Sequence, residues 1–226
     1  ITASHNPPEY NGFKAMIGHD TLSGDQIREL YDLASVEDFP PKKPGSIQVA
    51  DMNETYMEEI LASLNMGRKV KAVIDCGNGT AGITAMPLYQ KMGVEVVGLY
   101  TEVDGSFPNH HPDPTKAENL KDLIAAVREH KADLGIGFDG DADRIGVVDS
   151  RGRILWGDQL LVLLARDVLS RHPGRTVISE VKASEVLYEE IRKAGGKPIM
   201  WKAGHSLIKK KIYDCLLYTS DAADEE

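Results

Sequence analysis

The sequence predicts an α/β fold arranged as consecutive domains, and three features carry that prediction. Short apolar runs of β type alternate with segments whose apolar residues recur at helical spacing. A proline-rich segment at residues 39–45 separates this alternation from the N-terminal part of the chain. The alternation then starts afresh after about residue 151, as expected for a further α/β unit.

Residues 1–45 are expected to form the C-terminal part of a first domain together with a linker. Residues 2–12 are rich in Asn, Pro and Gly, which predicts an ordered loop. Ser23 and Gln26 have the spacing of a capping box, which predicts the start of a helix with one apolar face. The three prolines in residues 39–45 predict an interdomain linker.

Residues 46–151 are expected to form a second domain. Its predicted elements are, in order, a helix at 56–64, a strand at 70–75, a helix ending near 92, a strand at 94–99, a helix capped by Thr115 and Glu118, and strands at 134–138 and 145–148. Residues 76–82 invite comparison with a phosphate-binding loop, but they lack the Gly-Lys-Ser/Thr ending. We interpret them as a turn from strand to helix that glycine permits.

Residues 152–214 are expected to form part of a third domain with the same alternation. Its predicted strands lie at 153–156, 176–180 and 197–201, and its predicted helices at 158–169, at 183–193 and from 206 onward. Trp156 and Trp201 are expected to pack in the core, and residues 209–211, three lysines, to lie on a solvated helix face.

Both ends of the chain suggest a fragment of a longer protein. The chain starts at Ile1, inside a motif described below. Residues 215–225 read like the translation of a sequencing-library adapter, so native sequence is expected to stop near Asp214. Residues 215–226 are therefore expected to be a non-native tail.

The composition excludes several classes of protein. A net charge of −9 provides no basic surface for nucleic acid, so we expect no nucleic-acid partner. No apolar run approaches the ~18 residues of a membrane span, so we expect no membrane association. Two cysteines are too few for a disulfide framework, which favours a reducing, cytoplasmic location.

Three aspartates at alternating positions, Asp139, Asp141 and Asp143, predict a site for a divalent cation. They lie in a short loop between two apolar runs, where a hard cation would relieve the repulsion of converging carboxylates. Oxygen ligands favour Mg²⁺ or Ca²⁺. An EF-hand is excluded because Arg144 and Ser150 stand where its loop needs Gly and Glu. The alternative is a solvated acidic turn, which the flanking strands and the adjoining arginine disfavour.

Ser4 lies in a second motif, at residues 2–14, that could supply a nucleophile. A serine hydroxyl needs a base or a metal to act in this way, and His5 is its neighbour in the sequence. Neighbouring side chains on a loop need not meet, however. By itself this motif fits a turn in which Ser4 caps the backbone better than it fits a catalytic site.

Taken together, the two motifs resemble the α-D-phosphohexomutase superfamily. Residues 1–14, ITASHNPPEYNGFK, resemble its active-site serine loop, and residues 137–144 resemble its metal loop. Residues 201–211 are similar to the sugar-contacting segment of the bacterial phosphomannomutase/phosphoglucomutase branch, and residues 180–182 to a segment that supplies a substrate-contacting lysine. The resemblance runs from residue 1 to about Asp214. It implies consecutive mixed-sheet α/β domains, truncated at both ends.

The resemblance also implies a reaction, in which a phosphate moves between O1 and O6 of glucose or mannose through a phosphoserine and a 1,6-bisphosphate. Ser4 would carry the phosphoryl group and share Mg²⁺ with the three aspartates, and Arg144 would bind the phosphoserine. His5 and Lys14 would transfer protons, and Lys182 and His205 would hold the hexose phosphate. Alternatives are a phosphoglucosamine mutase and a non-catalytic sugar-phosphate-binding paralogue.

Three further residues complete the expectations for the site. Thr2 lies on the serine loop, but its side chain is expected to point away from Ser4. His110 and His111 are interpreted as loop residues, because no partner for metal binding adjoins them in the sequence.

We predict that the 226-residue chain, expressed by itself, does not interconvert glucose 1-phosphate and glucose 6-phosphate. The resemblance places the specificity loop and the domain that grips the second phosphate after Asp214. Lost positioning alone can remove about 7–11 kcal/mol of rate advantage. A coupled assay that detects a turnover of about 1 s⁻¹ or more would contradict this prediction.

Overall fold

The computed structural model describes residues 2, 4–7, 9–18, 20–22, 24–36, 45–64 and 66–214. The predicted capping residue Ser23, most of the predicted linker and the predicted tail lie outside these ranges. The chain divides into two compact units, which are described separately. The first unit comprises residues 1–14 and 39–155, and the second unit comprises residues 15–38 and 156–226.

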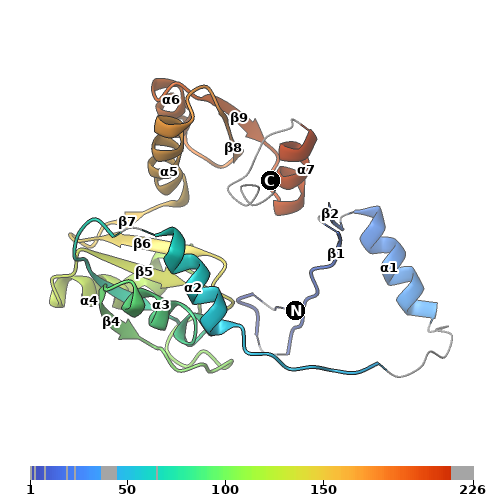
Figure 1. Ribbon diagram of the computed structural model, residues 1–226, viewed down its shortest axis with the longest axis horizontal. Coiled ribbons are helices and arrows are strands. Elements are labelled where there is room, and N and C mark those ends of the chain that lie inside the picture. Colours follow the sequence, from blue (N-terminus) through green and yellow to red (C-terminus); the bar gives the residue numbers. More distant parts are fainter. Residues whose placement is uncertain are drawn as a thin grey trace. The chain divides into compact units, whose positions relative to one another are not determined.

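A five-stranded mixed sheet forms the centre of the first unit (Figure 1). Its order is β4-β3-β5-β6-β7. Strands β3, β4 and β5 are parallel, whereas β6 pairs antiparallel with both β5 and β7. The strands are β3 (Lys71–Asp75), β4 (Glu95–Leu99), β5 (Leu134–Phe138), β6 (Ile145–Asp149) and β7 (Ile154–Leu155). The predicted mixed-sheet α/β class is confirmed.

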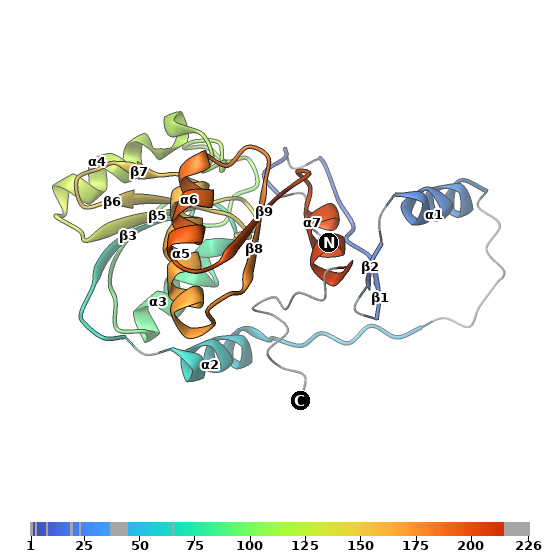
Figure 2. The same cartoon turned by 90° about the horizontal axis from the view of Figure 1, so that it is seen from above.

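Helices cover both faces of this sheet, as Figure 2 shows for α3 and α4. Successive residues of β3 point to opposite faces. Ala72 and Ile74 join the core beneath α3, while Val73 joins the core beneath α4. The helical segments are α2 (Asn53–Ser63), the 3₁₀ turns η1 (Thr80–Gly82) and η2 (Ala117–Leu120), α3 (Ala85–Lys91) and α4 (Lys121–Glu129).

Two local predictions in the first unit have different outcomes. The turn after β3 is confirmed, because Gly77 adopts a left-handed φ of 51° that glycine accepts without strain. The capping box at Thr115 is wrong. The Thr115 hydroxyl donates a hydrogen bond of 2.6 Å to the Asp113 carboxylate, and η2 begins after Lys116 without a side-chain cap.

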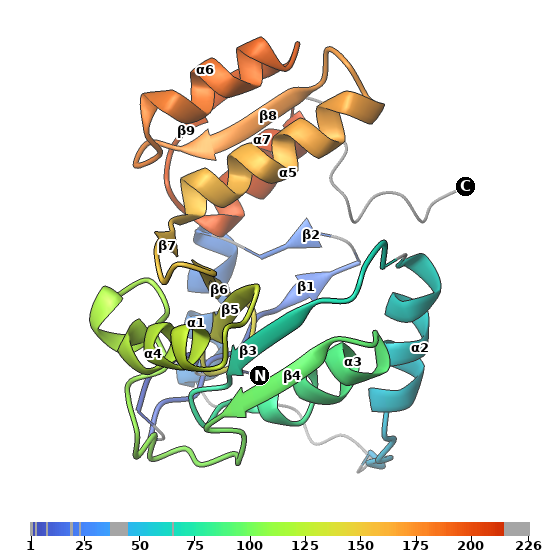
Figure 3. The same ribbon diagram turned by 90° about the vertical axis from the view of Figure 1, so that its left-hand side faces the viewer.

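The second unit contains a parallel strand pair and two helices that share a core (Figure 3). Ala165 and Leu169 from α5 pack with Leu187 and Ile191 from α6. The elements are β1 (Met16–Ile17), β2 (Asp20–Thr21), α1 (Asp25–Val36), α5 (Gly157–Arg171), β8 (Thr176–Glu180), α6 (Glu185–Lys193), β9 (Lys197–Trp201) and α7 (His205–Asp214). The alternation predicted after residue 152 is present from α5 onward. The strand predicted at 153–156 as part of the third domain is β7, however, and it belongs to the sheet of the first unit because it pairs with β6.

Trp156 and Lys211 differ from their predicted roles, whereas Lys209 and Lys210 are exposed, as predicted for a solvated helix face. Trp156 is 43% exposed, so its predicted place in the core is wrong. Trp201 is partly buried, and the Lys211 ammonium lies 4.4 Å from the centre of its ring. A cation over an indole face is attracted by the ring electrons, so Lys211 is not simply a solvated lysine.

Membrane spans were sought among the helices of the described residues. None of these helices is long and apolar enough to cross a bilayer.

Candidate functional site

Ser4 lies against the acidic loop of the first unit, which we define as residues 139–144 between β5 and β6. Ser4 and this loop are far apart in the sequence. Its hydroxyl lies 3.3 Å from Oδ2 of Asp139 and accepts a hydrogen bond of 2.7 Å from Nη2 of Arg144. Nδ1 of His5 is 3.1 Å from the same hydroxyl. The side chains of Ser4 and His5 therefore do contact each other. Arg144 and Asp139 of the acidic loop contact the same serine hydroxyl.

The serine loop and the acidic loop approach each other at their backbones. A Cβ on Gly140 would lie 2.3 Å from the carbonyl oxygen of Ser4, so only glycine fits there. Gly140 is itself held by the turn after β3, because its carbonyl accepts a hydrogen bond of 3.0 Å from the amide of Thr80. Ser4 has a left-handed φ of 55°, a conformation that costs a non-glycine residue about 1–3 kcal/mol. The contacts around Ser4 hold it in this strained state.

Asp139 is the buried centre of the site, with no exposed surface. Burial raises the pKa of its carboxyl above the ordinary value, although hydrogen bonds and charge from Arg144 oppose that rise. The Arg144 guanidinium pairs with Oδ2 at 2.7 Å, and the backbone amide of Arg144 donates to Oδ1 at 3.0 Å. A buried carboxylate is costly unless it is paired in this way.

Asp141 is held by a residue whose contribution was not predicted. The Thr2 hydroxyl donates a hydrogen bond to Oδ2 of Asp141 and accepts one of 2.8 Å from the amide of Ser4. The prediction that Thr2 points away from Ser4 is therefore wrong. Burial raises the pKa of Asp141, but the Thr2 hydrogen bond and the charge of Lys14 outweigh it and lower the pKa overall. Asp141 is consequently ionised.

Asp143 and Lys14 form the exposed edge of the site. The Lys14 ammonium lies 3.1 Å from Oδ2 of Asp143, and both side chains are at least half exposed. Exposed ion pairs contribute about 0–1 kcal/mol, so this pair positions the two groups without contributing much stability.

The residues of the acidic loop fit a hard divalent cation. Asp139, Asp141 and Asp143 each present a carboxylate oxygen, and these atoms all lie within 4.8 Å of one another. Oδ1 of Asp141 is buried and, within the described chain, has no hydrogen-bond partner. Such an atom costs free energy unless something binds it. Mg²⁺ binds oxygen ligands of this kind.

Three family models match the chain, each described as Phosphoglucomutase/phosphomannomutase, for alpha/beta/alpha domains I, II and III. They match residues 1–40, 54–152 and 156–217, respectively. The chain belongs to the α-D-phosphohexomutase superfamily.

Relatives in the superfamily are similar over nearly the whole chain. The "Phosphomannomutase/phosphoglucomutase" of Pseudomonas aeruginosa is 50% identical over 212 residues, which are 94% of this chain and 46% of that protein. The "Phosphoglucomutase" of Neisseria gonorrhoeae is 49% identical over 213 residues, with the same coverage. The crystal structure of a phosphoglucomutase/phosphomannomutase family protein from Burkholderia thailandensis superposes with a TM-score of 0.89 at 45% identity, covering 94% of this chain and 46% of that one. The chain thus spans about half the length of the curated relatives it matches.

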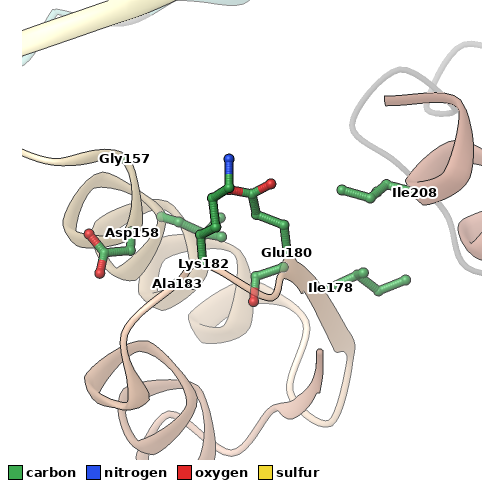
Figure 4. Close-up of a pocket in the computed structure, with 9 residues that line it drawn as sticks. Gly157, Asp158, Ile178, Glu180, Lys182, Ala183 and Ile208 are labelled. Atoms are coloured by element: carbon green, nitrogen blue, oxygen red, sulfur yellow. The ribbon is translucent and has the colours of Figure 1, made fainter. Parts of the chain in front are cut away.

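The second unit of this phosphohexomutase chain carries the two predicted sugar-binding residues. Lys182 lines a hollow of about 490 Å³ together with Asp158 and Glu180, and its side chain extends away from the ribbon (Figure 4). The backbone of His205 begins α7, but its side chain lies outside the described part. The structure therefore shows the surroundings of the Lys182 side chain but not those of the His205 side chain.

The loop between β4 and η2 contacts the serine loop. His110 and His111 of this loop are interpreted from the sequence only as loop residues. Nε2 of His110 pairs with the buried Asp75 at 2.9 Å. The next residue, His111, places its ring against that of His5, with centres 5.6 Å apart. Asp113 also lies near His5. Sequence spacing provided no signal for this, because more than 100 residues separate His5 from the loop.

The pairing of His110 with Asp75 generates a prediction about pH. The hydrogen bond that His110 donates to Asp75 is the largest influence on the His110 pKa, and it outweighs burial, so the pKa lies above its ordinary 6.5. The pair therefore stabilises the folded state fully below about pH 6.5, and this contribution disappears as the pH rises through the folded-state pKa. We expect the free energy of unfolding to fall over that range in metal-free buffer.

Replacing His110 with Gln should flatten this pH dependence. It should also destabilise the fold by about 3–5 kcal/mol at pH 6, because Asp75 would lose its partner while buried. His130→Gln, at an exposed position of the same unit, is the matched control. Denaturant unfolding from pH 6 to 9 measures both effects. An equal slope in wild type and His110→Gln would contradict the assignment.

Proposed function

We propose that the full-length protein interconverts hexose 1-phosphates and hexose 6-phosphates, of glucose or mannose, through a phosphoserine at Ser4. The observation that carries the proposal is the set of contacts around the Ser4 hydroxyl, which reaches Arg144, His5 and Asp139 at once. These contacts support roles for Ser4 as nucleophile, for Arg144 as the phosphate-binding group and for His5 as the proton-transfer group, beside a carboxylate cluster that fits Mg²⁺.

Arg144 is suited to hold a phosphoryl group on Ser4. Its Nη2 already donates to the Ser4 hydroxyl, and its Nε donates to Asp139 at 2.8 Å, which fixes the plane of the guanidinium. A planar guanidinium binds phosphate oxygens with two parallel hydrogen bonds, a geometry that lysine cannot supply. The phosphoserine would carry about −1.5 to −2 charges at this point.

Asp139, Asp141 and Asp143 would hold Mg²⁺ beside Ser4, together with an oxygen of the phosphoserine. When bound, Mg²⁺ neutralises charge that develops on the transferring phosphoryl group. The chain's own contribution is to keep the three carboxylates converged. Thr2 does so for Asp141, and Arg144 does so for Asp139.

His5 is placed to accept a proton when phosphate moves. Its Nδ1 lies 3.1 Å from the Ser4 hydroxyl, so the imidazole is within reach of a proton that moves at this oxygen. In the forward step a sugar oxygen bonds to phosphorus as the bond from phosphorus to Ser4 Oγ breaks. The sugar hydroxyl proton goes to a base such as His5, and the Ser4 oxygen takes up a proton. Lys14, ion-paired with Asp143, is the second proton-transfer candidate.

The sugar would be held by groups of the second unit. Lys182 provides a positive charge in a polar hollow, which suits a phosphorylated sugar. His205 stands at the start of α7, in the segment that resembles the sugar-contacting segment of the family. The phosphoglucosamine mutase alternative is tested by measuring mutase activity with glucosamine phosphates and comparing it with the activity on glucose and mannose phosphates.

Ser4→Ala in the full-length protein is predicted to abolish mutase activity. The variant lacks the oxygen that carries phosphate, and among the described residues no other hydroxyl contacts both Arg144 and Asp139. Intact-mass measurement should show an adduct of about 80 Da on the wild type and none on Ser4→Ala. Ser63→Ala, an exposed position in the same unit, should keep both adduct and activity. Normal turnover by Ser4→Ala would refute the phosphoserine assignment. Absence of the adduct with no turnover in the wild type would favour a non-catalytic paralogue.

Asp141→Asn is predicted to weaken Mg²⁺ binding and to slow phosphoryl transfer while the fold is retained. The substitution removes negative charge from the atom Oδ1, which is buried without a partner in the described chain. Titration of activity against Mg²⁺ should show a higher Mg²⁺ requirement than in the wild type. Glu118→Gln, an exposed charge change in the same unit, is the control. An unchanged Mg²⁺ requirement in Asp141→Asn would mean that the acidic loop is not the metal site.

A further inference from the structure

A second group of possible metal ligands lies next to the serine loop and does not include the three aspartates. His5, His111 and Asp113 each present one ligand atom, and these atoms all lie within 4.8 Å of one another. The two histidines come from different loops, and Asp113 follows His111 by two residues. The group thus combines two imidazoles and a carboxylate at one point of the first unit.

Each of the three side chains has an atom free to bind an ion. In the described part of the chain, both hydrogen bonds to the Asp113 carboxylate, from the Thr115 amide and hydroxyl, end on Oδ1 and none ends on Oδ2. Neither ring nitrogen of His111 has a hydrogen-bond partner among the described residues. Nδ1 of His5 contacts Ser4 and Arg144, so Nε2 is the nitrogen that would bind an ion.

The carboxylate of Asp113 is held in place by hydrogen bonds. Burial raises the pKa of Asp113, but the two hydrogen bonds from Thr115 outweigh that rise and help to lower the pKa overall. Its backbone carbonyl accepts a further hydrogen bond of 2.9 Å from the side chain of Asn119. Such outer hydrogen bonds orient a ligating carboxylate in metal sites.

A bound Zn²⁺ ion would draw the three ligand atoms closer together. Zn–N distances of about 2.1 Å put neighbouring ligand atoms of a tetrahedral site about 3.4 Å apart. Atoms up to 4.8 Å apart would therefore close by up to about 1.4 Å. His111 is exposed on a loop, where its side chain can turn. The rings of His5 and His111 already stand at 67° to each other, so their nitrogens can face one ion without stacking.

We propose that His5, His111 and Asp113 form a binding site for a borderline divalent transition metal, with Zn²⁺ as the favoured ion. Two imidazoles and one carboxylate plus water make up a common Zn²⁺ ligand set. Imidazole nitrogen suits Zn²⁺ and Co²⁺, whereas Mg²⁺ prefers the all-oxygen set of the acidic loop. The two sites are therefore chemically distinct neighbours. This proposal does not depend on the proposed function, although both involve His5.

Zn²⁺ at this site would also change what His5 can do. A metal on Nε2 moves the imidazole proton to Nδ1, and a protonated Nδ1 cannot accept a proton from a substrate hydroxyl. Metal binding by His5 and proton acceptance by His5 therefore exclude each other. In a mutase, occupancy of this site would inhibit the reaction without displacing Mg²⁺.

Zn²⁺ binding to the 226-residue chain tests the proposal. Isothermal titration with ZnCl₂ is performed in millimolar Mg²⁺, so that Mg²⁺ competes for the acidic loop. In a second measurement, the visible absorption of added Co²⁺ reports a site with imidazole ligands. We expect one equivalent to bind with micromolar or tighter affinity. His111→Asn should weaken binding at least about 10-fold, because loss of even an outer partner of a ligand costs 10–100-fold. His130→Asn, at an exposed position of the same unit, should bind like the wild type.

Other outcomes of this titration overturn the proposal. His111→Asn that binds Zn²⁺ as tightly as the wild type would exclude His111 as a ligand. Loss of Zn²⁺ binding in Asp141→Asn but not in His111→Asn would place the ion in the acidic loop. Absence of binding at micromolar Zn²⁺ by a wild-type chain with a normal circular dichroism spectrum would exclude the site altogether. None of these results bears on whether Ser4 is phosphorylated, so failure here leaves the proposed function standing.

Discussion

The site depends on one ion pair, between the buried Asp139 and the half-buried Arg144. Asp139 has no contact with solvent, so its charge is tolerated only because Arg144 supplies both its guanidinium and its backbone amide. The same guanidinium donates to the Ser4 hydroxyl. A single arginine therefore balances the charge of Asp139 and orients the serine, so neither role can be altered without affecting the other.

Close backbone packing brings the serine loop against this ion pair. Gly140 lets the acidic loop approach the Ser4 carbonyl, and its own carbonyl is tied to the turn after β3 through Thr80. Three loops thus stack at the carboxyl end of β3 and β5. This stacking keeps Ser4 in a left-handed conformation that a free loop would not retain. Strain at a reacting residue is a common feature of functional sites, and here its source is visible.

The loop between β4 and η2 supports the same region from the other side. The pair of His110 with Asp75 anchors it to the end of β3, in the interior of the unit. That anchor fixes the backbone from which His111 and Asp113 approach His5. One side of the Ser4 environment is therefore made of oxygen ligands suited to Mg²⁺, and the other of imidazole and carboxylate groups suited to a softer ion.

The sequence alone determined the α/β class, most of the strand and helix positions, and the two motifs around Ser4 and Asp139, because periodicity and short motifs are local properties of the chain. Tertiary structure decided which of these residues meet. Thr2 turned toward Asp141, Thr115 bonded Asp113 instead of capping a helix, and Trp156 stayed exposed. Each outcome depends on contacts between segments far apart in sequence, and no local pattern encodes such a contact. The clearest case is His111, whose meeting with His5 arises only when the sheet brings two loops together.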